Sequence, residues 1–172
     1  PGVETVLQEQ QLGTGHAVAV ARSKLEGKAD TILVTFADMP FIRQETLQKL
    51  LALHKKSASP VTMTSFIGDE ARGFGRVVRD NAGHVIAIVE QADATPEQLA
   101  ICEYNVSAYC FDASWLWQAL QRIPVSPKGE YYLTDVIALA VAGGFAVDSL
   151  VLDDPTEGIG LNNRVHLAAA EN

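Results

Sequence analysis

One uninterrupted run of apolar and β-branched residues, Thr31-Ile-Leu-Val-Thr-Phe36, limits the folds open to this chain. Such a run is typical of a β-strand covered on both faces, as in the parallel part of an α/β sheet. Ligands of open α/β sheets bind beyond the carboxyl ends of strands, and Asp38 stands just past the end of this run. We therefore expect an α/β fold with Asp38 at a binding crevice.

The rest of the chain alternates between helical and strand patterns. The turn Asp80-Asn-Ala-Gly83 separates residues 75–79 from 84–89, which predicts an antiparallel hairpin layer in the middle of the chain. Apolar periodicity predicts helices over residues 16–25, 45–54, 113–120 and 135–142, and further strands over 61–66, 104–111 and 146–152. Residues 1–172 are expected to form a single domain.

Composition narrows the classes of partner. A hydrophobic content of 48% in 172 residues is enough for one substantial core. The net charge of −8 argues against a nucleic-acid backbone or an anionic membrane as the main partner. No signal peptide or membrane-length apolar stretch is visible, so a cytoplasmic location is expected. Cys102 and Cys110 are expected to be reduced core thiols, without a zinc or disulfide pattern.

The segment Gln8–Ala17 combines glutamine side chains, a Gly13-Thr-Gly15 turn and the start of a predicted helix. Carboxamides offer in-plane donors and acceptors to a nucleobase edge, and glycines let the backbone approach a ligand closely. The N–H groups at the helix start would favour a phosphate. Taken alone, the same letters also fit an ordinary turn with a threonine cap.

Further unusual strings follow in order along the chain. They are Phe36-Ala-Asp-Met-Pro40, Gly73-Phe-Gly-Arg76, Ile88-Val-Glu-Gln91 with Asp93-Ala-Thr95, Gly129-Glu-Tyr-Tyr-Leu-Thr-Asp135 and Glu157-Gly-Ile-Gly-Leu-Asn-Asn-Arg164. With these strings the chain closely resembles, from about Val3 to its C-terminus, the N-acetylglucosamine-1-phosphate uridylyltransferase domain of the bifunctional bacterial enzyme that makes UDP-N-acetylglucosamine. The resemblance implies a Rossmann-like nucleotidyltransferase with a mixed sheet flanked by helices. It also implies transfer of UMP from UTP onto N-acetylglucosamine 1-phosphate, releasing pyrophosphate.

The resemblance also implies roles for individual residues. Asp38 and Asn162 match the family's catalytic Mg²⁺ ligands, and hard oxygen ligands of this kind are what Mg²⁺ prefers. On the residues alone, turn caps, solvated glutamines and packed side chains would explain the same positions. The implied uracil-binding residues are Gln8, Gln11, Gly13 and Thr14, and the implied sugar-binding residues are Gly75, Glu90, Asn105, Tyr132 and Thr134.

The chain also departs from the family pattern. The glycine-rich signature and lysine that hold the triphosphate are missing, together with the family's first, central strand. We therefore expect a partial domain that forms a homo-oligomer or is complemented by an N-terminal segment. Ala37 and Ser107 each replace a usual glycine, which leaves the sugar less certain than the reaction class. Two alternatives stay open: a non-catalytic relative that binds sugar nucleotides or serves in assembly, and a nucleotidyltransferase for another sugar 1-phosphate.

Overall fold

Strand β5 (Glu103–Asp112) organises the fold because it pairs with three other strands. In the computed structural model, which describes residues 2–69 and 73–161, β5 lies within an open six-stranded sheet. The strand order is β4-β3-β5-β2-β6, and β1 pairs with β5 outside this path. Only β2 and β6 run parallel, and the other ladders are antiparallel. The predicted α/β class with a mixed sheet flanked by helices is thus confirmed.

The helices and strands largely follow the predicted periodicity. The strands other than β5 are β1 (Thr31–Val34), β2 (Val61–Ile67), β3 (Arg76–Arg79), β4 (Val85–Val89) and β6 (Asp148–Val151). The α-helices are α1 (Thr14–Leu25), α2 (Gln44–His54), α3 (Pro96–Leu99), α4 (Ala113–Ala119) and α5 (Asp135–Ala142). Short 3₁₀ turns lie at η1 (Gln91–Asp93), η2 (Leu120–Arg122) and η3 (Pro155–Gly158).

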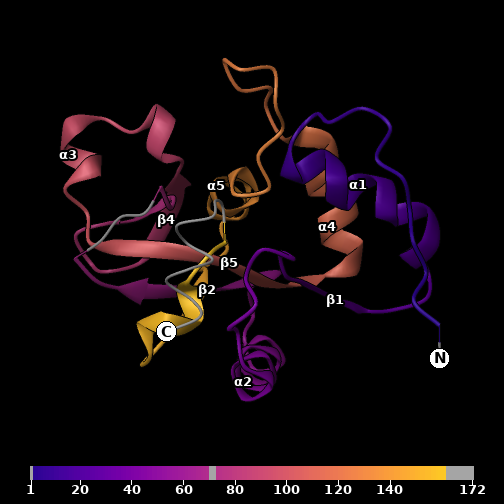
Figure 1. Ribbon diagram of the computed structural model, residues 1–172, viewed down its shortest axis with the longest axis horizontal. Helices are drawn as coiled ribbons and strands as arrows, with labels where there is room; N and C mark the ends of the chain where they lie inside the picture. Colours follow the sequence, from indigo (N-terminus) through magenta and orange to yellow (C-terminus); the bar gives the residue numbers. More distant parts are fainter. Residues whose placement is uncertain (1, 70–72, 162–172) are drawn as a thin grey trace.

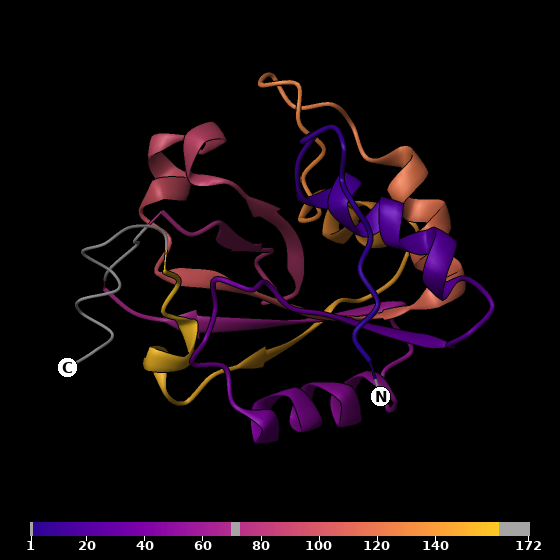
Figure 2. The same ribbon diagram turned by 45° about the vertical axis from the view of Figure 1, so that its right-hand side comes forward.

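The helices cover the sheet on two sides. Helix α2 lies on one face, and α1, α4 and α5 lie on the opposite face (Figure 1, Figure 2). Successive residues of β5 supply both contacts, because side chains of a strand alternate between its faces. Ala108 and Cys110 belong to a buried cluster with Leu50 of α2, whereas Tyr109 and Phe111 belong to the larger cluster on the other side.

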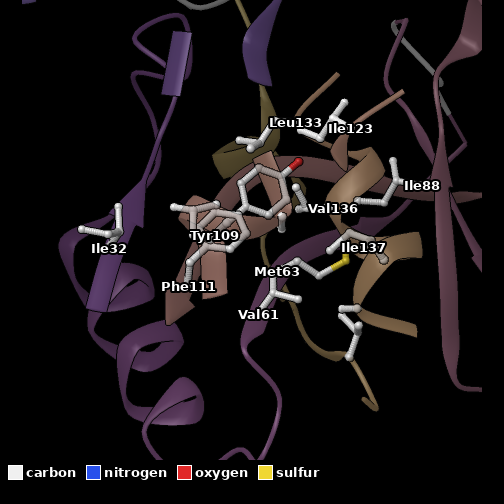
Figure 3. Close-up of a cluster of buried hydrophobic side chains, with 14 of the residues drawn as sticks. Ile32, Val61, Met63, Ile88, Tyr109, Phe111, Ile123, Leu133, Val136 and Ile137 are labelled. Atoms are coloured by element: carbon white, nitrogen blue, oxygen red, sulfur yellow. The ribbon is translucent and has the colours of Figure 1, made fainter. Parts of the chain in front are cut away.

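The larger cluster is the main core of the molecule. The rings of Tyr109 and Phe111 stack with centroids 5.7 Å apart, and Val61 and Met63 of β2 pack beside them (Figure 3). All four side chains are completely buried. Burying each apolar side chain of this size contributes about 1.5–3 kcal/mol, so this cluster holds α4 and α5 on the sheet.

Local sequence signals explain several boundaries. The carboxylate of Asp112 accepts a hydrogen bond from the backbone N–H of Trp115, which caps α4. Thr95 and Gln98 form a reciprocal capping box at α3. The predicted hairpin of β3 and β4 is confirmed: Asp80 Oδ1 accepts from two backbone N–H groups of its turn. This hairpin continues the main sheet through a pairing of β3 with β5.

The surroundings of β1 differ from the prediction. We expected residues 31–36 to form a parallel strand covered on both faces, but β1 runs antiparallel to β5, and Leu33 is 43% exposed. Within residues 2–69 and 73–161, β5 is the single strand paired with β1. The strand covered on both faces is instead β5, with seven of its ten residues buried.

The two cysteines also have different environments. Cys110 is fully buried, and burial raises the pKa of its thiol to about 11. Cys102 is exposed, so the expectation that both are core thiols is wrong for this residue. It lies just before β5, outside the apolar clusters.

Among the described helices, none combines the length and apolar character needed to cross a membrane.

Candidate active site

A cavity of about 270 Å³ lies where seven separate parts of the chain meet. The meeting segments include the loop before α1, the loop after β1, the middle of β5 and the segment leading into α5. Eight of the eleven predicted site residues line this cavity: Gly13, Thr14, Asp38, Gly75, Glu90, Asn105, Tyr132 and Thr134. The structure therefore brings together residues more than one hundred positions apart in sequence.

The glutamines of the first loop lie outside this lining. The side-chain amide of Gln8 donates to the carbonyl oxygen of Gly13 at 3.1 Å and contacts His16 Nδ1 at 3.0 Å. Gln11 is exposed. In this structure Gln8 thus supports the loop internally, and its predicted contact with a base stays a prediction, as does that of Gln11.

Backbone contacts join the first loop to the segment before α5. The N–H of Tyr131 donates to the carbonyl oxygen of Leu12 at 2.8 Å, and the N–H of Gly15 donates to that of Tyr131 at 2.8 Å. The hydroxyl of Thr14 accepts from the N–H of Leu133 at 2.9 Å. Because the cavity residues Tyr132 and Thr134 alternate with these bonded positions, the loop before α1 and the segment leading into α5 form one unit.

Two glycines permit this close approach. Gly13 has φ +96°, and a Cβ atom at this position would lie 2.7 Å from the carbonyl oxygen of Tyr131. A Cβ at Gly15 would lie 3.0 Å from a methyl carbon of Ile123. These glycines are therefore needed for packing against a neighbouring segment, and the predicted contact of Gly13 with a ligand stays a prediction.

Glu90 is an acid in the cavity lining whose environment changes its pKa. Burial raises the pKa of its carboxyl, and the neighbouring Asp93 adds to the rise, while a 2.9 Å hydrogen bond from Thr134 Oγ1 opposes it. Burial, followed by repulsion from Glu90 and Asp93, also raises the pKa of Asp135. An acid that is desolvated and held by a hydroxyl in a cavity is a candidate for binding polar ligand groups.

Asp38 is half-buried in the loop after β1, where it lines the cavity. Its carbonyl oxygen accepts a hydrogen bond from the backbone N–H of Leu161 at 2.8 Å. Asn162, the other predicted metal ligand, lies outside the described residues. The residue immediately before it is therefore bonded to the backbone of Asp38.

The buried carboxylate of Glu157 holds the segment that leads to Leu161 against the start of α2. Glu157 is 5% exposed and accepts hydrogen bonds from Thr46 Oγ1 at 2.6 Å and from the backbone N–H of Arg43 at 3.0 Å. The guanidinium of Arg43 pairs with Asp154 and lies 3.9 Å from Glu157. These contacts connect the start of α2 to the segment that leads to Leu161.

The donor set suits a hard divalent cation such as Mg²⁺. Mg²⁺ commonly takes one or two protein carboxylates and completes its octahedron with phosphates and water. Asp38 offers such a carboxylate in the lining, although no cluster of three or more His, Cys, Asp or Glu residues capable of holding a metal occurs in the described part of the chain. Asp38 thus provides one carboxylate of the kind that Mg²⁺ takes from a protein.

The described lining contains no lysine or arginine. Arg76 directly follows the lining residue Gly75 in sequence, but it is only 2% exposed. Its guanidinium carbon lies 5.1 Å from the centre of the Tyr104 ring. It also donates to the carbonyl oxygen of Phe74 and to Gln91. These internal partners hold Arg76 in the structure, so the described cavity has acidic rather than basic side chains.

Several lining residues were not singled out from the sequence. Phe36, Met39 and Phe74 supply apolar surface, and Glu130 adds a carboxylate. All four lie within the strings identified above, so the signal was present, although it did not separate lining residues from their neighbours. Of the two departures from the family pattern, Ser107 lines the cavity, whereas Ala37 is exposed and is not part of the lining.

The chain is similar to known proteins along almost its whole length. The chain is 42% identical over 172 residues to the bifunctional protein GlmU of Solibacter usitatus, covering 99% of the chain and 37% of that protein. It is 44% identical over 165 residues to bifunctional protein GlmU of Heliobacterium modesticaldum, covering 95% of the chain and 36% of the relative. The corresponding protein of Trichlorobacter lovleyi is 42% identical over 170 residues, with coverage of 98% and 37%.

The chain therefore spans little more than a third of the length of these relatives. The sequence profile described as "Nucleotidyl transferase" matches residues 2–154, which include all eight predicted residues found in the cavity. On the strength of this match, the chain belongs to the nucleotidyl transferase family.

Proposed function

We propose that this cavity is the site at which UMP is transferred from UTP to N-acetylglucosamine 1-phosphate, giving UDP-N-acetylglucosamine and pyrophosphate. The observation that carries the proposal is the convergence of the loop at Gly13, Asp38 and the Glu90–Thr134 pair on one cavity. The similarity to GlmU proteins supports this choice of substrates.

The reaction requires no nucleophile from the protein. A phosphate oxygen of the sugar 1-phosphate would attack the α-phosphorus of UTP as the bond to the pyrophosphate leaving group breaks. Protein groups would contribute by holding the two substrates in line and by excluding water. Glu90 and Thr134 would orient sugar hydroxyls, and the backbone around Gly13 and Thr14 would contact the nucleotide.

Asp38 is the residue proposed to hold Mg²⁺, together with Asn162 beyond the described residues. When bound, the cation would supply positive charge to the phosphates. This contribution matters because the described lining has three carboxylates, Asp38, Glu90 and Glu130, and no basic side chain.

The same acidity favours a second candidate, a non-catalytic relative that binds a sugar nucleotide without turnover. UTP carries more negative charge than UDP-N-acetylglucosamine, so the absence of basic residues from the described lining weakens triphosphate binding more than product binding. In this reading the fold is retained for binding or for assembly.

Two measurements on the same purified chain separate these candidates. The first follows pyrophosphate release with UTP, Mg²⁺ and a panel of sugar 1-phosphates, and the second follows UDP-N-acetylglucosamine binding by calorimetry. Release that is fastest with N-acetylglucosamine 1-phosphate supports the proposed reaction, and release that is fastest with another sugar 1-phosphate supports a relative of different specificity. Saturable binding without release supports the non-catalytic candidate, and the absence of both would contradict a nucleotide-sugar site.

We also propose that β1 pairs with an additional strand, from a second copy of the chain or from a complementing N-terminal segment. The described β1 has β5 as its one strand partner, and Leu33 is 43% exposed. Sedimentation equilibrium of the chain alone and with a peptide for such a segment tests this pairing. A monomer that binds no peptide would contradict it.

A further inference from the structure

Ser107 has an unusual backbone conformation at the cavity wall. Its φ of +60° is the one positive value found at a non-glycine residue in the described part of the chain. A side chain in this left-handed region is disfavoured by about 1–2 kcal/mol, and such positions concentrate at ligand sites when the surrounding structure enforces them.

A bulge in β5 enforces the conformation of Ser107. The ladder between β2 and β5 pairs Met63 with Tyr109 and Ser65 with Asn105. Between these pairs β2 has one residue, Thr64, and β5 has three, from Val106 to Ala108. The extra residues bend β5, and a bulge of this kind turns a side chain away from the regular alternation of the strand.

The hydrogen bonds around Asn105 determine what the Ser107 hydroxyl can do. The backbone N–H of Ser107 donates to Asn105 Oδ1 at 3.2 Å. The Asn105 amide nitrogen therefore faces Tyr109 Oη at 2.6 Å and Ser107 Oγ at 3.4 Å, and it donates to both oxygens. Ser107 is also a hydrogen-bond neighbour of the Tyr109 hydroxyl and acts to lower the pKa of that group. Because Ser107 Oγ accepts from the Asn105 amide, the hydroxyl proton of Ser107 is available either to Tyr109 Oη or to a ligand in the cavity.

The exposed fractions of Asn105, Ser107 and Tyr109 indicate that Ser107 is the member of this group that faces the cavity. Asn105 is 3% exposed and Tyr109 is fully buried, while Ser107 is only partly buried and lines the cavity. In Figure 3 the Tyr109 hydroxyl points away from Val61 and Met63. Ser107 is thus the cavity-facing end of a chain of hydrogen bonds anchored in the core.

From these contacts we propose that Ser107 is a specificity-determining residue whose hydroxyl donates a hydrogen bond to an oxygen of the sugar. The inference rests on the proposed function, and it follows from the position of Ser107 beside Asn105 and in the lining of the same cavity as Glu90 and Thr134. Asn105 itself is bonded within the protein, so Ser107 takes over the direct contact that the sequence assigned to Asn105.

The test compares two ligands that differ by the sugar. Binding of UDP-N-acetylglucosamine and of UDP is measured by calorimetry for the unsubstituted chain, Ser107→Ala and Ser107→Gly. Loss of one hydrogen bond should weaken UDP-N-acetylglucosamine binding about three- to tenfold in both variants and leave UDP binding unchanged. Ser107→Gly should also unfold at a higher temperature than Ser107→Ala, since glycine removes the backbone strain.

Other outcomes separate this inference from the proposed function. Equal weakening of both ligands, or unchanged binding of both by the two variants, would overturn the role of Ser107 while leaving the nucleotide-sugar site in place. If the unsubstituted chain binds neither ligand, the proposed function and this inference both fail.

Discussion

At the scale of single residues, Glu90 combines a cost to the fold with a proposed role in binding. Burial raises the pKa of its carboxyl, so the folded protein binds a proton at this position more tightly than the unfolded chain. Ionised Glu90 therefore lowers the free energy of unfolding at neutral pH. Its hydrogen bond from Thr134 recovers only part of this cost.

Replacing Glu90 by Gln should raise the melting temperature at pH 7 and weaken sugar-nucleotide binding. The stability gain should shrink as the pH falls through the raised pKa of Glu90 and vanish below the ordinary value of about 4.3, where both states are protonated. Thermal unfolding at a series of pH values measures this trend. The exposed Glu97 is the matched control, because the pKa of its carboxyl is lowered by hydrogen bonds at the start of α3 and Glu97→Gln should give no gain.

At the scale of elements, the contact between the first loop and residues 131–133 positions one side of the cavity. Gly13→Ala should disturb this contact, since the added Cβ would lie 2.7 Å from a backbone oxygen. Gly27→Ala, at the other end of α1, introduces a Cβ at a φ of +73° with no atom within 4 Å. The second variant therefore isolates the cost of positive φ alone, about 1–2 kcal/mol.

We expect Gly13→Ala to lower the free energy of unfolding by about 1–3 kcal/mol more than Gly27→Ala, because overpacking adds to the backbone strain. Urea unfolding of both variants gives this difference. Equal losses in the two variants would show that the loop does not pack against Tyr131 as described.

Glu157 connects two other elements, α2 and η3. Both hydrogen bonds to Glu157 end on Oε2, so Glu157→Gln keeps an acceptor oxygen but removes the negative charge that strengthens them and that faces Arg43. A loss of about 1–3 kcal/mol is expected. The exposed Glu45 of α2 is the control, and Glu45→Gln should change the free energy of unfolding by no more than about 0.5 kcal/mol. Urea midpoints that are the same for both variants would argue against the buried contact.

The helices and strands also show which parts of the fold local sequence patterns can predict. Helical periodicity and turn residues were sufficient to locate α1, α2, α4, α5 and the β3–β4 hairpin. The apolar run at residues 31–36 located β1 but not its neighbours, because hydrophobicity reports burial without saying which strand provides it. The bulge at Ser107 was equally hidden, since it arises from the pairing of β5 with β2 rather than from the serine itself.

Most of the residues that line the candidate site could be named from the sequence, but their contacts could not. Eight of the eleven named residues converge on the cavity, and their strings carried the family resemblance. The internal contacts of Gln8 could not be foreseen, because a glutamine amide can bond equally well to a ligand or to its own loop. Asn105 shows the same limit, since its partners come from the bulge and from a buried tyrosine.

At the scale of the whole molecule, an acidic chain is proposed to bind an anionic ligand. The net charge is −8, and the described lining of the cavity contains carboxylates but no basic side chain. Bringing a diphosphate to such a surface is unfavourable unless a cation lies between the charges. The account therefore predicts that ligand binding depends on Mg²⁺ and on the carboxylate of Asp38.

The most direct measurement is calorimetric titration of the chain with UDP-N-acetylglucosamine, with Mg²⁺ and with a chelator, for the unsubstituted protein, Asp38→Ala and Asp30→Ala. Asp30 is an exposed residue just before β1 and serves as the control for loss of one negative charge. We predict saturable binding that weakens at least tenfold, about 1.4 kcal/mol, on chelation or in Asp38→Ala, and is unchanged in Asp30→Ala. Binding that is absent, or that is indifferent to both Mg²⁺ and Asp38, would contradict a metal-assisted nucleotide-sugar site in this cavity.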